Sequence, residues 1–172
     1  MKKCLDLGVG GANRIPDGYK GYGVDIKKQQ RDWLKENKEA DLALDPIPYK
    51  SDMFDVVQAY DFMEHIPMAI YDNGKKRNCM IELFNEIYRV LKDGGLFYMQ
   101  TPCYPSKMAF QDPTHLSFWT DETIHYFCGD YYSFHDHNNH KSKFVLESNR
   151  IENNHLYVYL KAIKPDEPPY EV

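Results

Sequence analysis

A glycine-rich turn lies near the start of the sequence, with aspartates before and after it. Gly8, Gly10 and Gly11 follow a short apolar run that contains Asp6, and Asp25 comes 17 positions after Gly8. Glycine lets the backbone turn sharply and approach a ligand without a Cβ atom in the way. A carboxylate at the end of the next strand can accept hydrogen bonds from both hydroxyls of a ribose. The turn and Asp25 together therefore predict a nucleoside pocket.

The kind of nucleoside depends on the residues that follow the turn. A dinucleotide fingerprint needs Gly-x-Gly-x-x-Gly, but Asn13 stands at its last glycine position, and no full-length helix follows to receive a pyrophosphate. This pattern disfavours NAD and FAD, and with them an oxidoreductase. The alternative in such an architecture is S-adenosylmethionine, whose ammonium and sulfonium charges suit an acidic pocket. Four aspartates supply that negative charge: Asp6, Asp25, Asp41 and Asp61.

Strands have to position these residues at one edge of a sheet. Apolar or β-branched runs predict strands over residues 3–7, 21–26, 40–44, 54–60 and 96–102. The segment 143–164 predicts two more strands that turn at Asn153-Asn154. The predicted fold class is α/β: a Rossmann-like, open, mostly parallel twisted sheet in three αβα layers, with a C-terminal antiparallel strand pair. In such a sheet, ligands bind beyond the carboxyl ends of the strands.

The helices expected around this sheet differ in strength. Apolar residues at three- and four-residue spacings predict the best helix over about 78–92, ended by a pair of glycines. Residues 27–39 predict a marginal surface helix, and a short one is expected near 121–127. The connection between the first two strands leaves room for only a stunted helix. The length of 172 residues indicates one domain over 1–164, with a short proline-rich tail over 165–172.

Five segments of the sequence resemble, in order and spacing, the class I S-adenosylmethionine-dependent methyltransferases, especially the small ones with a shortened first helix. The segments are LDLGVGGA, GVDI, ADLALDPIPYKSDMFDVV, DFMEHIP and EIYRVLKDGGLFYMQTP. The resemblance covers roughly residues 3–120. It implies a methyltransferase domain with S-adenosylmethionine as its cofactor.

The resemblance also implies which residues bind the methionine end of the cofactor. Asp6 would lie near the amino group. The other residues implied at this end are Gly8, Val9, Gly10, Tyr60 and Asp61.

At the nucleoside end, the resemblance gives the ribose to Asp25 and the packing on adenine to Ile26. Asp41 would accept a hydrogen bond from the adenine amino group, and the backbone of Leu42 would meet the ring. The following segment is one residue longer than the family pattern, so Asp45 is an alternative to Asp41. The alternative without a ligand is that Gly8 and Gly10 serve only a tight turn and that Asp25 caps the next helix.

The methyl acceptor is expected to lie under the segment 103–120, which leaves the carboxyl end of a strand beside the cofactor. In it, QDPTHLSFWT resembles a stretch found in a subset of the family. His115 would point inward, with Phe118 and Trp119 as walls. A base is needed only if an acceptor hydroxyl must lose a proton. His115 is the predicted base and Asp112 its orienting residue, while a purely structural role of His115 is the alternative.

Two neighbouring residues, Glu64 and His65, receive no catalytic role from the sequence. Glu64 is expected to hold the same loop in place, and His65 to be a structural or cofactor-side group. The run HDHNNH over 135–140 has three histidines, but their spacing matches no common zinc site. We therefore expect no metal site.

Composition limits the class of partner. The net charge of −5 makes nucleic acid and anionic membranes unfavourable partners, and no apolar run is long enough to span a membrane. The four cysteines are far apart, which fits a reducing compartment and predicts a cytoplasmic protein.

The sequence as a whole predicts a methyltransferase that acts on a small-molecule or sugar-like acceptor. The alternative is a non-catalytic module or partner subunit that binds S-adenosylmethionine. The short segment before the first strand favours that alternative. It has two residues, whereas many relatives have a longer segment there that covers the substrate.

Overall fold

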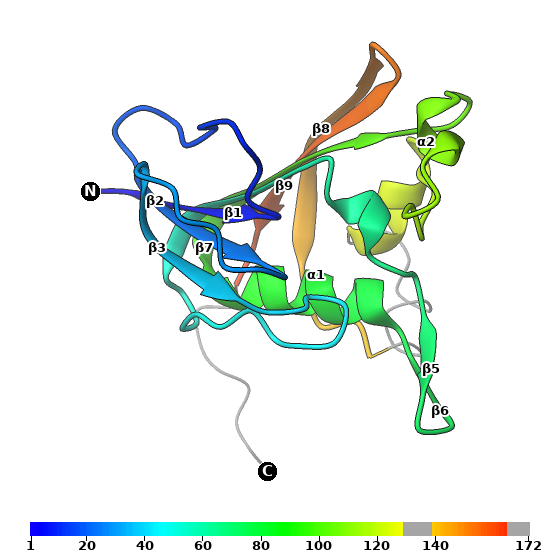
Figure 1. The fold of residues 1–172 in the computed structure, drawn as a ribbon, viewed down its shortest axis with the longest axis horizontal. Helices are drawn as coiled ribbons and strands as arrows, with labels where there is room; N and C mark the ends of the chain where they lie inside the picture. The colour runs from blue at the N-terminus through cyan, green and yellow to red at the C-terminus, as the bar shows by residue number, and fades with distance from the viewer. Residues whose placement is uncertain (129–138, 165–172) are drawn as a thin grey trace.

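A seven-stranded sheet forms the body of the computed structural model, which describes residues 1–128 and 139–164 (Figure 1). The strand order is β3-β2-β1-β4-β7-β9-β8. The strands are β1 (Lys3–Leu7), β2 (Lys20–Asp25), β3 (Leu34–Glu39), β4 (Phe54–Tyr60), β7 (Leu91–Pro102), β8 (Phe144–Glu152) and β9 (His155–Ala162). The first five pair in parallel, and β9 pairs antiparallel with β7 and β8. The expected open sheet with a C-terminal antiparallel pair is confirmed.

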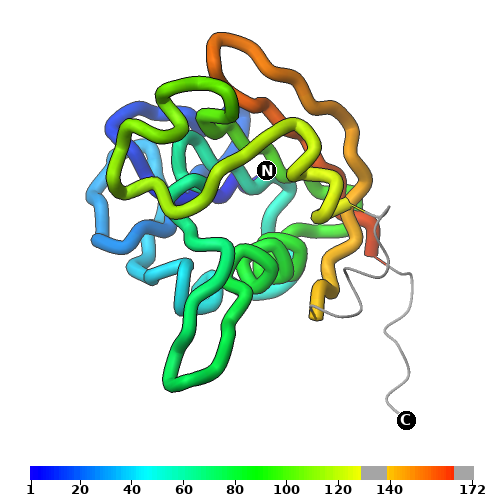
Figure 2. The backbone as a smooth tube through the Cα atoms, turned by 90° about the vertical axis from the view of Figure 1, so that its right-hand side faces the viewer, coloured from blue at the N-terminus to red at the C-terminus, as the bar shows by residue number. Residues whose placement is uncertain are grey.

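Short helices and one hairpin connect the strands. They are α1 (Cys79–Val90), α2 (Met108–Gln111), the 3-10 helices η1 (Met63–His65) and η2 (Thr123–Phe127), and the antiparallel pair β5 (Ile70–Asp72) and β6 (Lys75–Arg77). Asn73 and Gly74 at the hairpin turn both have positive φ. Two-residue hairpin turns favour this geometry, so the Asn-Gly pair could have predicted the hairpin from the sequence. In Figure 2 the hairpin projects away from the body.

The helix α1 lies along one face of the sheet and builds the core (Figure 1). Its apolar residues recur at helical spacing and are buried, and the ring of Phe84 meets that of Phe97 on β7 at 5.7 Å. The helix ends at Val90, before the two glycines that were expected to end it. The reason is that Leu91 is fully buried, has an extended backbone and pairs with Phe54 of β4.

The face opposite α1 is covered in two ways. The loop 8–19 lies over β1 and β2. The side chain of Ile15 in this loop occupies the space that a Cβ atom on Gly21 of β2 would need. Further along, the tyrosines of β4, β7 and β9 form a row in which Tyr98 lies 4.9 Å from Tyr60 and 4.7 Å from Tyr159 between ring centroids. The third layer is therefore built here from a loop and aromatic side chains.

The secondary structure expected over residues 27–44 is wrong. Residues 34–39 form the edge strand β3, which pairs in parallel with β2, and no part of 27–39 is helical. Helix propensity describes only local preferences. It could not predict that a polar segment would pair with β2 as an edge strand, because that pairing is a tertiary interaction. The strand expected over 40–44 is instead a turn, in which the carbonyl of Asp41 accepts hydrogen bonds from the amides of Leu44 and Asp45.

The stunted helix expected between β1 and β2 is a loop. The side chain of Asn13 accepts a hydrogen bond from the amide of Ile15 at 3.0 Å, and the amide of Tyr19 donates to the carbonyl of Pro16 at 3.1 Å. Such local bonds compete with a helix. By contrast, the turn at Asn153-Asn154 is confirmed, since both residues have positive φ between β8 and β9. The expected tail 165–172 and residues 135–138 of the histidine-rich run lie outside the described residues.

Candidate cofactor and acceptor site

The carboxyl ends of β1, β2 and β4 meet at one edge of the sheet, onto which Figure 2 looks. The central strand β1 pairs with β2 on one side and with β4 on the other, so the strand order reverses here. Open α/β sheets bind their ligands at such a point. The site therefore has to be looked for at this edge.

A hollow of about 260 Å³ opens at this edge. It is lined by Asp6, Gly8, Gly10, Gly11, Ala12, Arg14, Tyr60 and Asp61. The structure thus brings together the residues that the sequence predicted at the methionine end, except for Val9. The side chain of Val9 is buried next to Gly23.

Asp6 is the buried acid of this hollow. Its side chain is 4% exposed, and Oδ1 accepts a hydrogen bond from Nε2 of Gln58 at 3.1 Å. Burial raises the pKa of Asp6 to about 6; the Gln58 bond and Arg14 oppose this rise, and Asp25 adds to it. A buried carboxylate at this position favours a cationic ligand group.

Arg14 is a charged residue of this site that the sequence did not predict. Its guanidinium lies 4.3 Å from the centroid of the Tyr60 ring, and its carbonyl accepts a hydrogen bond from Gln58 at 3.2 Å. An acid and a base in one hollow fit the ammonium and the carboxylate of an amino acid. The sequence signal that could have identified Arg14 is a basic residue inside the glycine-rich loop, because such a loop brings the charge close to a bound ligand.

The glycine turn needs glycine at position 8. The amide of Gly8 donates to the carbonyl of Val24 at 2.9 Å, and Gly8 has a φ of +70°. A Cβ atom at this position would also collide with the ring of Phe62. At Gly10, in contrast, no atom of the described residues lies within 4 Å of the point that a Cβ atom would take, which leaves space for a ligand beside Gly10.

Asp25, predicted to bind the ribose, and Ile26, predicted to pack on adenine, lie at the end of β2 next to this turn. Oδ1 of Asp25 accepts a hydrogen bond from the amide of Lys27 at 3.1 Å. Ile26 is 62% exposed, which leaves its side chain available for packing. From the loop before β3, Nε of Arg31 donates to the carbonyl of Gly10 at 3.0 Å, so the loops after β1 and β2 are joined.

The residues predicted around adenine form the turn after β3. The amide of Ala40 donates to the carbonyl of Asp25 at 3.0 Å, which holds this turn beside the end of β2. The amide of Asp41 donates to Oδ2 of Asp45 at 3.1 Å, and Oδ1 of Asp41 accepts from Ala43. The side chain of Leu42 belongs to the core. Neither aspartate lines the 260 Å³ hollow, and the choice between them stays a prediction.

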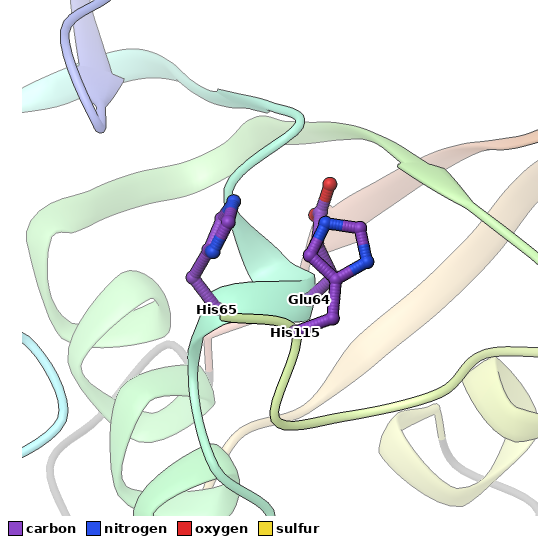
Figure 3. Close-up of side chains that lie close together, drawn as sticks. All are labelled: Glu64, His65 and His115. Atoms are coloured by element: carbon purple, nitrogen blue, oxygen red, sulfur yellow. The ribbon is translucent and has the colours of Figure 1, made fainter. Parts of the chain in front are cut away.

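The segment 103–128 crosses the edge of the sheet beyond this hollow (Figure 2). It is tied to η1, because the amides of Leu116 and Ser117 donate to the carbonyl of Glu64 at 2.7 and 3.0 Å. Glu64 thus holds the loop, as the sequence suggested, through its backbone. Figure 3 shows that the side chains of Glu64, His65 and His115 project to the same side of η1.

The hydrogen bonds of the two histidines determine which ring nitrogen is free. Thr114 uses its hydroxyl proton on Oδ1 of Asp112 at 2.7 Å, and its carbonyl and hydroxyl oxygens both lie 3.2 Å from Nδ1 of His65. Nδ1 of His65 must therefore be the donor. Nδ1 of His115 donates to the carbonyl of Ala109 at 3.1 Å, since a carbonyl can only accept. In its neutral form each ring thus has its lone pair on Nε2.

The predicted orienting residue, Asp112, faces the other nitrogen of His115. Its Oδ2 lies 3.9 Å from Nε2, which is too long for a hydrogen bond, while two hydrogen bonds from Thr114 lower the pKa of Asp112. The carbonyl of Ala109 is what fixes the His115 ring. The expected wall Trp119 is wrong: it is fully buried in the core and its Nε1 donates to the hydroxyl of Ser117, whereas Phe118 is 49% exposed.

Glu64 is a buried carboxyl group on this side of the site, at 2% exposure. Burial raises the pKa of Glu64, although hydrogen bonds from its own amide and from Thr101 oppose the rise. Oε2 accepts a hydrogen bond from the Thr101 hydroxyl on β7 at 2.9 Å.

No helix of the described residues has the length and apolar character needed to cross a membrane.

A family model described as a methyltransferase domain matches residues 5–99, more than half of the chain. This chain belongs to the methyltransferase family. The predicted family is confirmed, and with it an enzyme that transfers a methyl group and uses S-adenosylmethionine as its cofactor. The acidic and basic groups of the hollow, Asp6 and Arg14, fit the methionine end of that cofactor.

Solved structures share the fold of this methyltransferase. A Haloferax volcanii protein described as a methyltransferase, in complex with the Trm112 methyltransferase activator, has a TM-score of 0.65 and 15% identity over 97% of this chain and 84% of that one. A Methanosarcina mazei S-adenosylmethionine-dependent methyltransferase has a TM-score of 0.61 and 14% identity over 94% and 92%. One from Aquifex aeolicus has a TM-score of 0.58 and 11% identity over 94% and 82%. No curated protein matches the sequence.

Proposed function

We propose that this methyltransferase methylates a hydroxyl group of a small-molecule or sugar-like acceptor. The observation behind this proposal is the hydrogen bond from Nδ1 of His115 to the carbonyl of Ala109, which leaves the lone pair on Nε2 when the ring is neutral. His115 belongs to the segment that crosses the cofactor edge (Figure 2). A hydroxyl acceptor has to lose a proton during methyl transfer, and a neutral imidazole is a suitable proton acceptor.

The residues of the hollow would hold and orient the cofactor. When bound, S-adenosylmethionine supplies a methyl group on a positively charged sulfur, and the electron pair of the broken C–S bond stays on that sulfur. Asp6 would bind the ammonium and Arg14 the carboxylate of its methionine end. Asp25 would accept from the ribose hydroxyls. The adenine would lie near Ile26, Leu42 and either Asp41 or Asp45.

His115 would then take the acceptor proton on Nε2 while the carbonyl of Ala109 keeps the ring in place. Asp112 would favour the positive charge that forms on His115 without bonding to it, since its carboxylate is 3.9 Å away. On the same segment, Phe110 and Phe118 stack at 4.8 Å between centroids and are about half exposed, at 54% and 49%. Exposed stacked rings can pack against the apolar face of a sugar, which supports a sugar-like acceptor.

Two measurements test the proposal. Calorimetric titration should show binding of S-adenosylmethionine and none of NAD. A panel of monosaccharides, phenols and amines is then assayed for S-adenosylhomocysteine, with His115→Ala and the control His125→Ala beside the unaltered protein. We expect turnover with a hydroxyl acceptor and a loss of about 10²-fold or more in His115→Ala only. Turnover with amines alone, or full turnover of His115→Ala, would contradict the proposal, and binding without any turnover would indicate a non-catalytic module.

A further inference from the structure

Glu64, His65 and His115 bring metal-binding atoms together at the acceptor side of the site. Each offers one ligand atom, and these atoms lie within 4.8 Å of one another (Figure 3). Glu64 and His65 come from η1, and His115 comes from the segment after α2. We propose that Glu64, His65 and His115 form a binding site for a divalent transition-metal ion. Two imidazoles and one carboxylate with open positions are a known donor set for zinc and for iron(II).

The hydrogen bonds of both imidazoles match those of metal ligands. A ligating histidine usually donates its other ring N–H to a backbone carbonyl or a carboxylate, which fixes the tautomer and the ring orientation. Here Nδ1 of His65 donates to the carbonyl of Thr114, and Nδ1 of His115 donates to that of Ala109. Both Nε2 atoms are therefore free to bind an ion without any change of tautomer.

The carboxylate of Glu64 is held in a comparable way. The Thr101 hydroxyl on β7 donates to Oε2 at 2.9 Å, and the residue is 2% exposed. Among the described residues, no lysine or arginine forms an ion pair with Glu64. A buried carboxylate without a cationic partner is unfavourable, and a bound ion would supply the positive charge.

The donor atoms have to approach each other slightly when the ion binds. Bonds of about 2.0–2.2 Å in a tetrahedral site place the ligand atoms about 3.4 Å apart, so separations of up to 4.8 Å have to shorten by up to roughly 1.4 Å. His65 is partly exposed, so its ring can make this movement. The two nitrogen donors favour a transition metal over Mg²⁺, which prefers oxygen ligands.

The consequence for catalysis rests on the proposed function, whereas the binding of the ion does not. Nε2 of His115 cannot bind an ion and accept a proton at the same time. With the ion bound, an acceptor hydroxyl on an open position of the ion would have a lowered pKa and lose its proton to water. The ion would then replace His115 as the group that activates the acceptor.

Binding is tested with Co²⁺ as the probe and without any cofactor. The full chain is freed of metal with EDTA, and Co²⁺ is added while its visible absorption and the heat of binding are measured. We expect the His65→Ala/His115→Ala double variant to bind one equivalent fewer than the unaltered protein and than the control His125→Ala. Binding by other histidines, including those at 135–140, would remain in the double variant. An equal number of equivalents at equal affinity in all three proteins would overturn the proposal.

Three further variants separate binding from folding. Thr101→Val removes only the partner of Glu64, and we expect about 10-fold weaker Co²⁺ binding. Glu64→Gln tests the carboxylate itself. If this variant of a buried residue does not fold, His65→Ala repeats the test at a partly exposed position.

For catalysis, we expect EDTA to abolish most of the turnover with a hydroxyl acceptor and Co²⁺ or Mn²⁺ to restore it. Full turnover in EDTA would overturn the catalytic role, while the titration alone decides the site.

Discussion

Gln58 on β4 donates a hydrogen bond of 3.1 Å to the carboxylate of Asp6 on β1, 52 positions away in the sequence. Both side chains are buried at the edge where the cofactor hollow opens. Burial raises the pKa of Asp6 to about 6, even though Gln58 stabilises the charged form. Asp6 therefore changes its charge within a pH range in which the protein can be studied.

Affinity for S-adenosylmethionine should fall as the pH is lowered through about 6. Protonation of Asp6 removes the negative charge that the cofactor ammonium would meet, so between pH 8 and pH 5 we expect a loss of up to about 10-fold. The measurement is calorimetric titration across this range. Asp6→Asn should bind more weakly at pH 8 and show no such dependence. Parallel pH profiles for the two proteins would show that Asp6 does not meet the ammonium.

The same carboxylate should make the folded protein less stable at high pH. The pKa of Asp6 is about 6 in the folded chain against 3.8 unfolded, so its contribution is fully present below 3.8 and is lost as the pH rises through 6. Asp6→Asn avoids this loss, and we expect it to be more stable than the unaltered protein by up to about 3 kcal/mol at pH 8 and by little at pH 4. Urea unfolding at both pH values measures the difference. Asp17→Asn, on the exposed loop, is the control and should show no such trend.

Gly8→Ala should destabilise the protein and abolish cofactor binding. The positive φ of Gly8 disfavours alanine, and the new methyl group would collide with Phe62. We expect a loss of about 1–3 kcal/mol in the free energy of unfolding. Gly10→Ala is the matched control, because nothing in the described part of the chain lies within 4 Å of its Cβ position. It should fold normally and lose only cofactor affinity, and equal stability of the two variants would contradict the argument.

The sequence predicted the parts of this fold that depend on local signals. Apolar and β-branched runs, helical spacing and the turn at Asn153-Asn154 predicted four parallel strands, α1 and the C-terminal pair. The strand β3 could not be predicted in this way, because its polar residues 34–39 form a strand only through pairing with β2. The Asn73-Gly74 hairpin was within reach and was missed.

The candidate site also has a part that the sequence predicted and a part that it did not. The glycine turn and the residues after β1 and β4 were predicted, because parallel strands place their carboxyl ends at one edge. The contribution of Arg14 depends on the path of a loop over Tyr60, which no periodic pattern encodes. The proximity of His65 and His115 likewise depends on the hydrogen bonds between two loops. The sequence therefore indicated both residues but did not predict that their rings lie close together.

Asp25→Asn should weaken the binding of every ligand that carries the ribose. The substitution keeps Oδ1 as acceptor for the amide of Lys27 but removes the charge and one acceptor oxygen. Loss of a charge-assisted hydrogen bond corresponds to about 1.5–3 kcal/mol, or roughly 10- to 100-fold in affinity. Because Asp25 also raises the pKa of Asp6, the pH midpoint of cofactor binding should move downward in this variant. An unchanged affinity would place the ribose elsewhere.

Arg14→Met should weaken the binding of S-adenosylmethionine but not that of methylthioadenosine, a compound with the same nucleoside and no amino acid. The guanidinium lies over Tyr60 in the hollow that also contains Asp6, so it can pair with the cofactor carboxylate, whereas methionine keeps the packing on the ring without the charge. We expect a loss of roughly 10-fold or more for S-adenosylmethionine and less than about 2-fold for methylthioadenosine, measured by calorimetry at about pH 8. Asp25→Asn should weaken both ligands alike, which makes it the matched comparison. If Arg14→Met weakens both ligands equally, Arg14 supports the loop rather than the carboxylate, and the methionine end has been assigned to the wrong groups.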